Sequence, residues 1–257
     1  MVLRDDPDSA AAPSSPPSGE PASRYFRSGL GLRREVRGDV EAEYDSQVVR
    51  SLREHDFTLE QDGITFRLAR EFGFCYGVER AVDYAYETVR RFPDRRIVLI
   101  GEIIHNPKVN ARLRALGIRF LGDPEVEAVE ALGPDDVVVL PAFGVPTEQF
   151  DALRATGAIL VDTTCGSVLN VWKNVERYAR EERTAIVHGK ATHEETRATV
   201  SRVLLTKGAH YLVVLDREEA EFVADLIRGE DRGGTWTRAT FLERFKDRTS
   251  EGFDPAL

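Results

Sequence analysis

The sequence contains few cysteines, two in 257 residues, and no apolar run long enough to cross a membrane. So low a cysteine count excludes a disulfide-stapled scaffold. The chain also lacks a glycine-rich phosphate loop of the Walker or dinucleotide type and the HExxH motif of zinc proteases. Its net charge of −9 argues against broad nucleic-acid binding. We therefore expect no membrane segment, no nucleic-acid partner and a cytoplasmic location.

The first part of the chain has the composition of a tail followed by an arm. Residues 1–23 lack the apolar core of a signal peptide, and they are too acidic for an organelle transit peptide. Their richness in Ala, Pro and Ser predicts a disordered tail. Residues 24–62 are expected to form an N-terminal arm, in which apolar spacing predicts a helix over 40–53.

From residue 63 onward, short apolar runs alternate with amphipathic segments. This alternation predicts an α/β fold with parallel sheets and crossover helices. The expected strands are 64–69, 96–100, 118–121, 136–140, 159–161, 185–187 and 211–215, and the expected helices are 78–91, 106–117, 167–180, 193–202 and 218–228.

The two halves of this region share one layout. Each has a strand, a turn with a cysteine close to a glycine, a helix, and then a histidine after a later strand. Cys75 and Cys165 are separated by nearly the same number of residues as His105 and His193. We therefore expect repeated α/β lobes packed around a shared centre. The expected divisions are a tail at 1–23, an arm at 24–62, a first lobe at 63–145, and a second lobe with the start of a further connection at 146–257.

Each cysteine is predicted to lie between the end of a strand and the start of a helix. Ligand sites in α/β sheets gather at that edge, and a helix N-terminus favours the thiolate that binds metal. The alternative is that each cysteine is a small buried hydrophobe. The equivalent placement of Cys75 and Cys165 in two lobes favours a ligand role.

The two loop histidines and a neighbouring glutamate form a second candidate group. His105 and His193 precede predicted helices, where an imidazole can hold a phosphate; the alternative for each is a structural role. Glu195 either closes a capping box with Thr192 or serves the site. Two cysteines and two histidines permit a zinc site or an iron–sulfur cluster, and the residues alone do not choose between them.

Six motifs occur in an informative order: GFCYGVERAV (73–82), EIIHNPKVNARL (102–113), LPAFGV (140–145), VDTTC (161–165), VW (171–172) and HGKATHEET (188–196). Together they resemble the 4-hydroxy-3-methylbut-2-enyl diphosphate reductase family, and the arm resembles the extended plant and cyanobacterial form. The resemblance implies three α/β lobes around a pseudo-threefold axis, with one cysteine of each lobe binding a 4Fe–4S cluster.

The same resemblance implies an enzyme for the last step of the methylerythritol phosphate route to isoprenoids. The substrate, a small diphosphate, is dehydroxylated reductively to isopentenyl and dimethylallyl diphosphates, with electrons from a ferredoxin or flavodoxin type of donor. Cys75 and Cys165 would be cluster ligands, His105 and His193 would bind the diphosphate, and Glu195 would be the catalytic proton donor.

The chain departs from the family pattern at three places. Phe143 replaces a histidine of many members, as in the extended form, and Gly166 stands where a proline is usual. The sequence ends at 252–257, where the third lobe and third cysteine would follow. The resemblance therefore implies a C-terminally truncated chain — a fragment, a frameshifted product or half of a split enzyme — that does not turn over substrate alone. The alternatives are a non-catalytic remnant and a zinc protein using the same Cys and His set.

Overall fold

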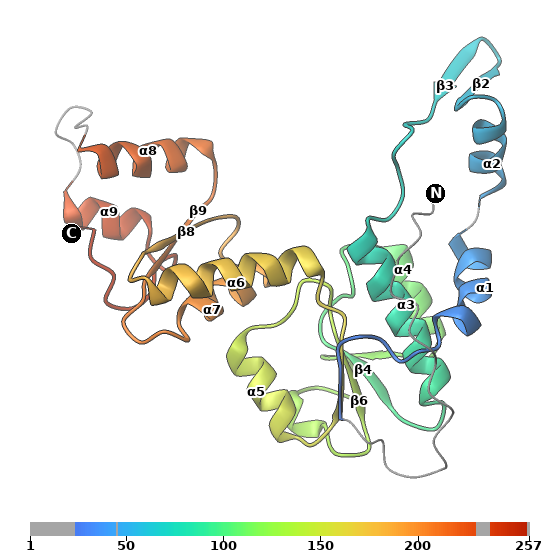
Figure 1. Ribbon diagram of the computed structural model, residues 1–257, viewed down its shortest axis with the longest axis horizontal. Helices are drawn as coiled ribbons and strands as arrows, with labels where there is room; N and C mark the ends of the chain where they lie inside the picture. The colour runs from blue at the N-terminus through green and yellow to red at the C-terminus, as the bar shows by residue number, and fades with distance from the viewer. Residues whose placement is uncertain (1–23, 45, 230–236, 256–257) are drawn as a thin grey trace.

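The computed structural model describes residues 24–44, 46–229 and 237–255, so the predicted tail lies outside the described residues. Its main element is a five-stranded parallel sheet with the strand order β1-β7-β6-β4-β5 (Figure 1). The predicted α/β class is thereby confirmed. The strands are β1 (Tyr25–Phe26), β4 (Ile97–Leu99), β5 (Arg119–Phe120), β6 (Val137–Leu140) and β7 (Ile159–Asp162).

Successive side chains of a strand point to opposite faces of the sheet. Here both faces are apolar, and helices cover both of them. Leu99 and Val139 pack with the face that carries three helices, and Val98 and Val138 pack with the other. The first face carries α1 (Arg33–Tyr44), α3 (Tyr76–Arg91) and α4 (Pro107–Ala115), and the second carries α5 (Thr147–Ala155) and the short helix η1 (Val129–Ala131).

A smaller unit follows and lies beyond α6 in Figure 1. Its two strands are parallel and form a separate sheet, and a distinct apolar core around Leu212 and Phe245 holds the helices on it. In the described ranges, no helix is both long and apolar enough to cross a membrane. The elements are α6 (Gly166–Arg180), β8 (Ala185–His188), α7 (Glu194–Val203), β9 (Tyr211–Val214), α8 (Arg217–Arg228) and α9 (Arg238–Arg244).

The arm contributes β1 to the main sheet and then leaves it. After α1 come α2 (Gln47–Glu54) and an antiparallel hairpin of β2 (Thr58–Gln61) and β3 (Ile64–Arg67), which extends away from the sheet in Figure 1. The single helix expected over 40–53 is wrong, since Ser46 caps the start of α2 by accepting a hydrogen bond from the Val49 N–H.

The expected lobe division at residue 146 does not follow the strand pairing. β7 pairs in parallel with β6, and α5 packs on the same sheet, so both belong to the main sheet rather than to the second lobe. The chain leaves this sheet after Asp162. The repeat is also less regular than expected, because the strand before Cys75 is β3 of the outlying hairpin, whereas the strand before Cys165 is β7 of the main sheet.

Candidate functional site

Both cysteines occupy the N-cap positions of long helices. Cys75 caps α3 and Cys165 caps α6, each with an extended backbone conformation. Neither side chain makes a capping hydrogen bond, and both thiols are free. Cys75 is exposed and Cys165 is half-buried. The predicted placement at helix starts therefore holds for both, and both sulfur atoms remain available to a ligand.

The starts of these two helices touch each other. A Cβ atom on Gly77, in the first turn of α3, would overlap the Cys165 Sγ atom. In the opposite direction, a Cβ on Gly166 would lie 3.3 Å from the Tyr76 hydroxyl. Cys75 immediately precedes Tyr76, so the two helix starts that carry the cysteines are neighbours.

Arg80 of α3 fixes this contact; it lies within the 73–82 motif, but the sequence alone indicates no role for it. Its Nη1 donates to the Thr164 carbonyl at 2.9 Å, directly before Cys165. Its Nη2 donates to the Arg27 carbonyl of the arm at 2.5 Å, and its Nε donates to the Tyr84 hydroxyl at 3.1 Å. One guanidinium thus ties α3 to the arm and to the turn that carries the second cysteine.

Three loops meet at the carboxyl edge of the main sheet, the usual place for ligand sites in such sheets. After β6, the Ala142 N–H donates to the Ile103 carbonyl of the loop after β4, at 3.2 Å. The Cys165 N–H, after β7, donates to the Ala142 carbonyl at 2.9 Å. These backbone hydrogen bonds hold the loops of three neighbouring strands in fixed register.

The two predicted histidines come together at this edge. The Nε2 atoms of His105 and His193 are 2.9 Å apart. The Glu195 N–H donates to His193 Nδ1 at 3.2 Å, and His105 Nδ1 lies 3.0 Å from a carboxylate oxygen of Glu102. Since His193 accepts at Nδ1, its neutral ring donates from Nε2 to His105 Nε2. His105 then carries its proton on Nδ1 and donates to Glu102, so each group has a compatible partner.

Phe143 completes the wall around the histidines. Its ring stacks on His105 at a centroid distance of 4.5 Å and 23° between planes, and it meets His193 edge-on at 5.7 Å. The sequence marked Phe143 as a departure from the family pattern, and the structure places it in ring contact with both histidines. Glu102 was missed, because a lone glutamate three residues before a histidine has no signature of its own.

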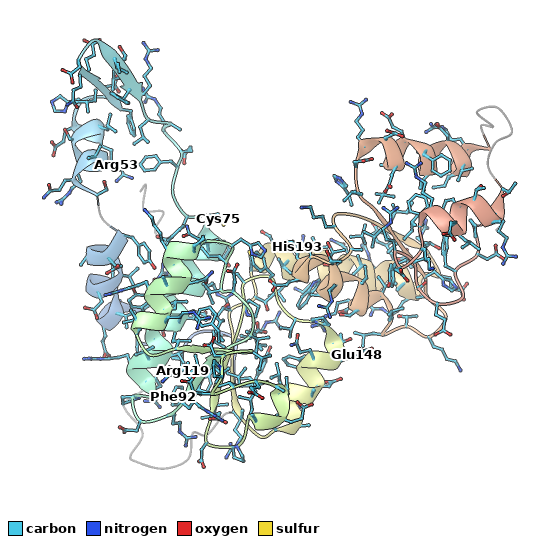
Figure 2. The ribbon with its side chains drawn as sticks, turned by 180° about the vertical axis from the view of Figure 1, so that it is seen from behind. Arg53, Cys75, Phe92, Arg119, Glu148 and His193 are labelled. Carbon is cyan, nitrogen blue, oxygen red and sulfur yellow. The ribbon has the colours of Figure 1, made fainter. Side chains whose placement is uncertain are left out.

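Glu195 does not cap a helix through its side chain. The N-cap of α7 is His193, through its ring nitrogen, so the alternative in which Glu195 closes a capping box with Thr192 is wrong. Glu195 and His193 line a common cavity of about 530 Å³, together with His188. Figure 2 shows His193 and Cys75 on the side of the main sheet from which the smaller unit extends.

The arrangement of donor atoms bears on the metal hypotheses. Within the described ranges, no group of three or more His, Cys, Asp or Glu residues is placed to hold a metal ion. The two histidines bond to each other rather than joining Cys75 and Cys165, which disfavours the four-ligand zinc site. Two free thiols at helix starts are of the ligand type that iron–sulfur clusters use.

Comparison with known proteins gives consistent matches. The LytB protein family model matches residues 66–249. A 4-hydroxy-3-methylbut-2-enyl diphosphate reductase of Gloeobacter violaceus is 46% identical over 240 residues, which cover 91% of this chain and 55% of the relative. The reductase of a Synechococcus strain is 45% identical over 235 residues, with the same coverage. The chain thus spans about half the length of the curated relatives that it matches.

Solved structures agree with the fold. A structure of (E)-4-hydroxy-3-methyl-but-2-enyl diphosphate reductase, described as the terminal enzyme of the non-mevalonate pathway, is 28% identical with a TM-score of 0.51. That match covers 68% of this chain and 60% of the other. The structure of the corresponding reductase of Plasmodium falciparum is 23% identical with a TM-score of 0.52, and the match covers 59% of this chain and 45% of the Plasmodium chain. At this identity the match supports the fold alone.

Proposed function

The chain belongs to the LytB family, and from this premise we propose that it supplies the diphosphate-binding edge and two cluster ligands of a 4-hydroxy-3-methylbut-2-enyl diphosphate reductase. The observation that carries the proposal is the meeting of His105 and His193, 2.9 Å apart, at the sheet edge whose loops also hold Cys165. The reaction proposed is substrate plus two electrons and two protons, giving isopentenyl or dimethylallyl diphosphate plus water.

The histidine pair would bind the diphosphate group. Both Nε2 atoms face one point, so an anion placed there can accept from both rings if each carries a proton on Nε2. Protonation of His105 at Nε2 would supply the second donor while its Nδ1–H stays on Glu102. Such charge-assisted hydrogen bonds to phosphate oxygens are stronger than hydrogen bonds between neutral groups. Phe143 would keep water from the ring faces.

Cys75 and Cys165 would hold a 4Fe–4S cluster, which supplies electrons and a Lewis acid when bound. In this proposal the N-terminal ends of α3 and α6 add backbone N–H groups that favour thiolates. Glu195 lines the same cavity as His193, and its carboxyl group would deliver a proton to the departing hydroxyl. A reduced donor of the ferredoxin or flavodoxin type in the cytoplasm remains a prediction from the sequence.

A titration with inorganic pyrophosphate tests the binding half of the proposal. We expect the ring resonances of His105 and His193 to shift saturably in the full chain, and each His→Ala variant to weaken binding at least about tenfold, the loss of a charged hydrogen bond. His55→Ala is the matched control, because that exposed histidine lies at the end of α2, where its ring Nδ1 is 2.7 Å from the Ser51 carbonyl oxygen. Unchanged affinity in both site variants would contradict the proposal.

Anaerobic reconstitution with iron and sulfide tests the cluster half. The proposal expects broad visible absorbance with iron and sulfide in the protein, lost in Cys75→Ser and in Cys165→Ser. A colourless protein that binds zinc would favour the zinc alternative. A stable protein that binds pyrophosphate but assembles no cluster would favour the non-catalytic remnant.

A further inference from the structure

A second cavity of about 520 Å³ lies outside the histidine site, where the arm, α5, α6 and α7 meet. Its apolar wall includes Phe150, Leu169 and the ring of Trp172. Both its volume and its mixed lining match those of small-molecule sites. The loop after β6 separates the two regions: Phe143 contacts the histidine rings, whereas Gly144 lies directly against the Trp172 ring.

Cationic side chains outnumber acidic ones around this cavity. Four cations line it, and none of them forms an ion pair with a described residue: Arg27, Arg154, Lys173 and Arg202. The acids are Asp162 and Glu176. Asp162 is already engaged, since it accepts from the Tyr25 hydroxyl at 2.6 Å and from the backbone and side chain of Thr164 at 2.9 and 2.5 Å. The cavity therefore carries an excess of positive charge.

Two buried donors in its wall have no acceptor. Trp172 is 6% exposed, and within the described chain neither its Nε1 nor the buried Nε of Arg202 finds a hydrogen-bond partner. The Arg202 guanidinium lies 4.1 Å above the Trp172 ring, and burial lowers the pKa of this arginine. Trp172 and Arg202 both line the cavity, so an acceptor bound there would lie beside these two residues.

We propose that this cavity binds a small organic phosphate, with its phosphate group beside Arg202 and the Trp172 indole and its apolar part against Phe150 and Leu169. Arginine presents a fork of N–H donors that matches phosphate oxygens, and Lys173 and Arg154 add charge at the rim. A free inorganic anion would use the donors and leave the apolar wall uncovered. The site is separate from the histidine pair and does not depend on the proposed reductase function.

Phenyl phosphate is a suitable probe, because it joins one phosphate to one apolar ring. In full-length protein labelled with ¹⁵N-tryptophan, Trp236→Phe leaves the Trp172 indole as the single indole signal. We expect phenyl phosphate to shift that signal saturably and to bind at least about threefold more tightly than inorganic phosphate, since its ring covers apolar surface. Arg202→Met should weaken binding at least about tenfold.

Lys173→Met removes another positive charge that lines the cavity. Because Lys173 is exposed, this variant remains informative if Arg202→Met fails to fold. Arg180→Met, later on α6, is the matched control and should bind like the parent protein. His105→Ala should leave the Trp172 shift unchanged. The proposal is overturned by an absent or unsaturable shift, by equal binding of phosphate and phenyl phosphate, by loss of the shift in His105→Ala, or by Lys173→Met behaving like the control.

Discussion

At the scale of single residues, the histidine pair shows how tautomers follow from backbone geometry. The Glu195 N–H fixes the acceptor nitrogen of His193, and this in turn places the proton of His105 on Nδ1, from which it is donated to Glu102. Glu102 therefore acts on the site through His105. Such a carboxylate partner holds an imidazole in one tautomer and one ring orientation.

Replacing Glu102 by Ala should release His105 from its Nδ1–H tautomer. Without an acceptor at Nδ1, we expect the more common Nε2–H tautomer, which would face the Nε2–H of His193 and break the 2.9 Å contact. Nitrogen-15 shifts of the ring atoms, measured where both rings are neutral, report the tautomer directly. Glu148→Ala, on α5, is the control. A His105 ring that carries its proton on Nε2 in the parent protein would contradict the assigned chain, whereas an unchanged tautomer in Glu102→Ala would show that the hydrogen bond from His193 alone fixes it.

Glu219 allows a test by pH in the smaller unit. Burial alone would raise its pKa, but hydrogen bonds from Arg248, at 2.7 and 3.1 Å, and from the Leu215 N–H, at 2.7 Å, outweigh burial and lower it below the ordinary 4.5. A lowered pKa stabilises the folded protein above the unfolded value and loses that contribution as the pH falls through the folded pKa.

Glu219→Gln should therefore destabilise the protein by about 1.5–3 kcal/mol at pH 7, and the difference from the parent should shrink as the pH falls below 4.5. Urea unfolding of the parent and the variant, at pH 7 and at a pH below 4.5, measures the difference in their free energies of unfolding. Glu221→Gln, on the same helix in an exposed pair with Arg217, should change stability by less than about 0.5 kcal/mol. A difference from the parent that stays constant with pH would show that the carboxylate does not carry the effect.

At the scale of elements, the contact between the starts of α3 and α6 depends on glycine. Gly77→Ala places a methyl group on the Cys165 sulfur and should destabilise by about 1–3 kcal/mol. Gly38→Ala, inside α1 with open space around it, should instead stabilise by about 0.5–1 kcal/mol. Thermal or urea unfolding compares the two. Equal stabilisation by both changes would mean that the helix starts are not in contact.

The helices and strands that the sequence predicted are those with strong periodicity. Apolar runs such as 136–140 and 185–187 are buried or partly buried strands, and the cysteine turns do begin helices. Pairing partners are set by long-range packing, which periodicity does not contain. For that reason the expected boundary at 146 does not follow the pairing of β7 with β6, and β1 is not among the expected strands. Phe143, Glu102 and Arg80 matter through contacts across loops, so sequence spacing alone could not identify them as a group.

At the scale of the whole molecule, the described residues form a main unit and a smaller unit with separate apolar cores, joined through α6 and α7. Helices cover both faces of the main sheet, whereas β8 of the smaller sheet has an exposed apolar side chain. Ile186 of β8 is 46% exposed, and its strand pairs within the described residues only with β9. At the opposite edge of β9, the Val213 N–H donates to the Arg248 carbonyl and the Tyr211 carbonyl accepts from the Ser250 N–H. The two units should therefore differ in local stability.

Hydrogen exchange should reveal that difference. Amides of β6, paired on both sides and fully buried, should exchange at least about 100-fold more slowly than those of β8, a gap of about 2.8 kcal/mol in opening free energy. β9 serves as the internal control, because it shares a sheet with β8 but has both edges bonded, and its amides should exchange more slowly than those of β8. Equal protection of β8 and β6, measured by mass spectrometry of the full chain, would mean that the smaller sheet opens only when the whole molecule unfolds. In that case α6 and α7 would join both cores into one cooperative unit, and the separate cores would have no thermodynamic independence.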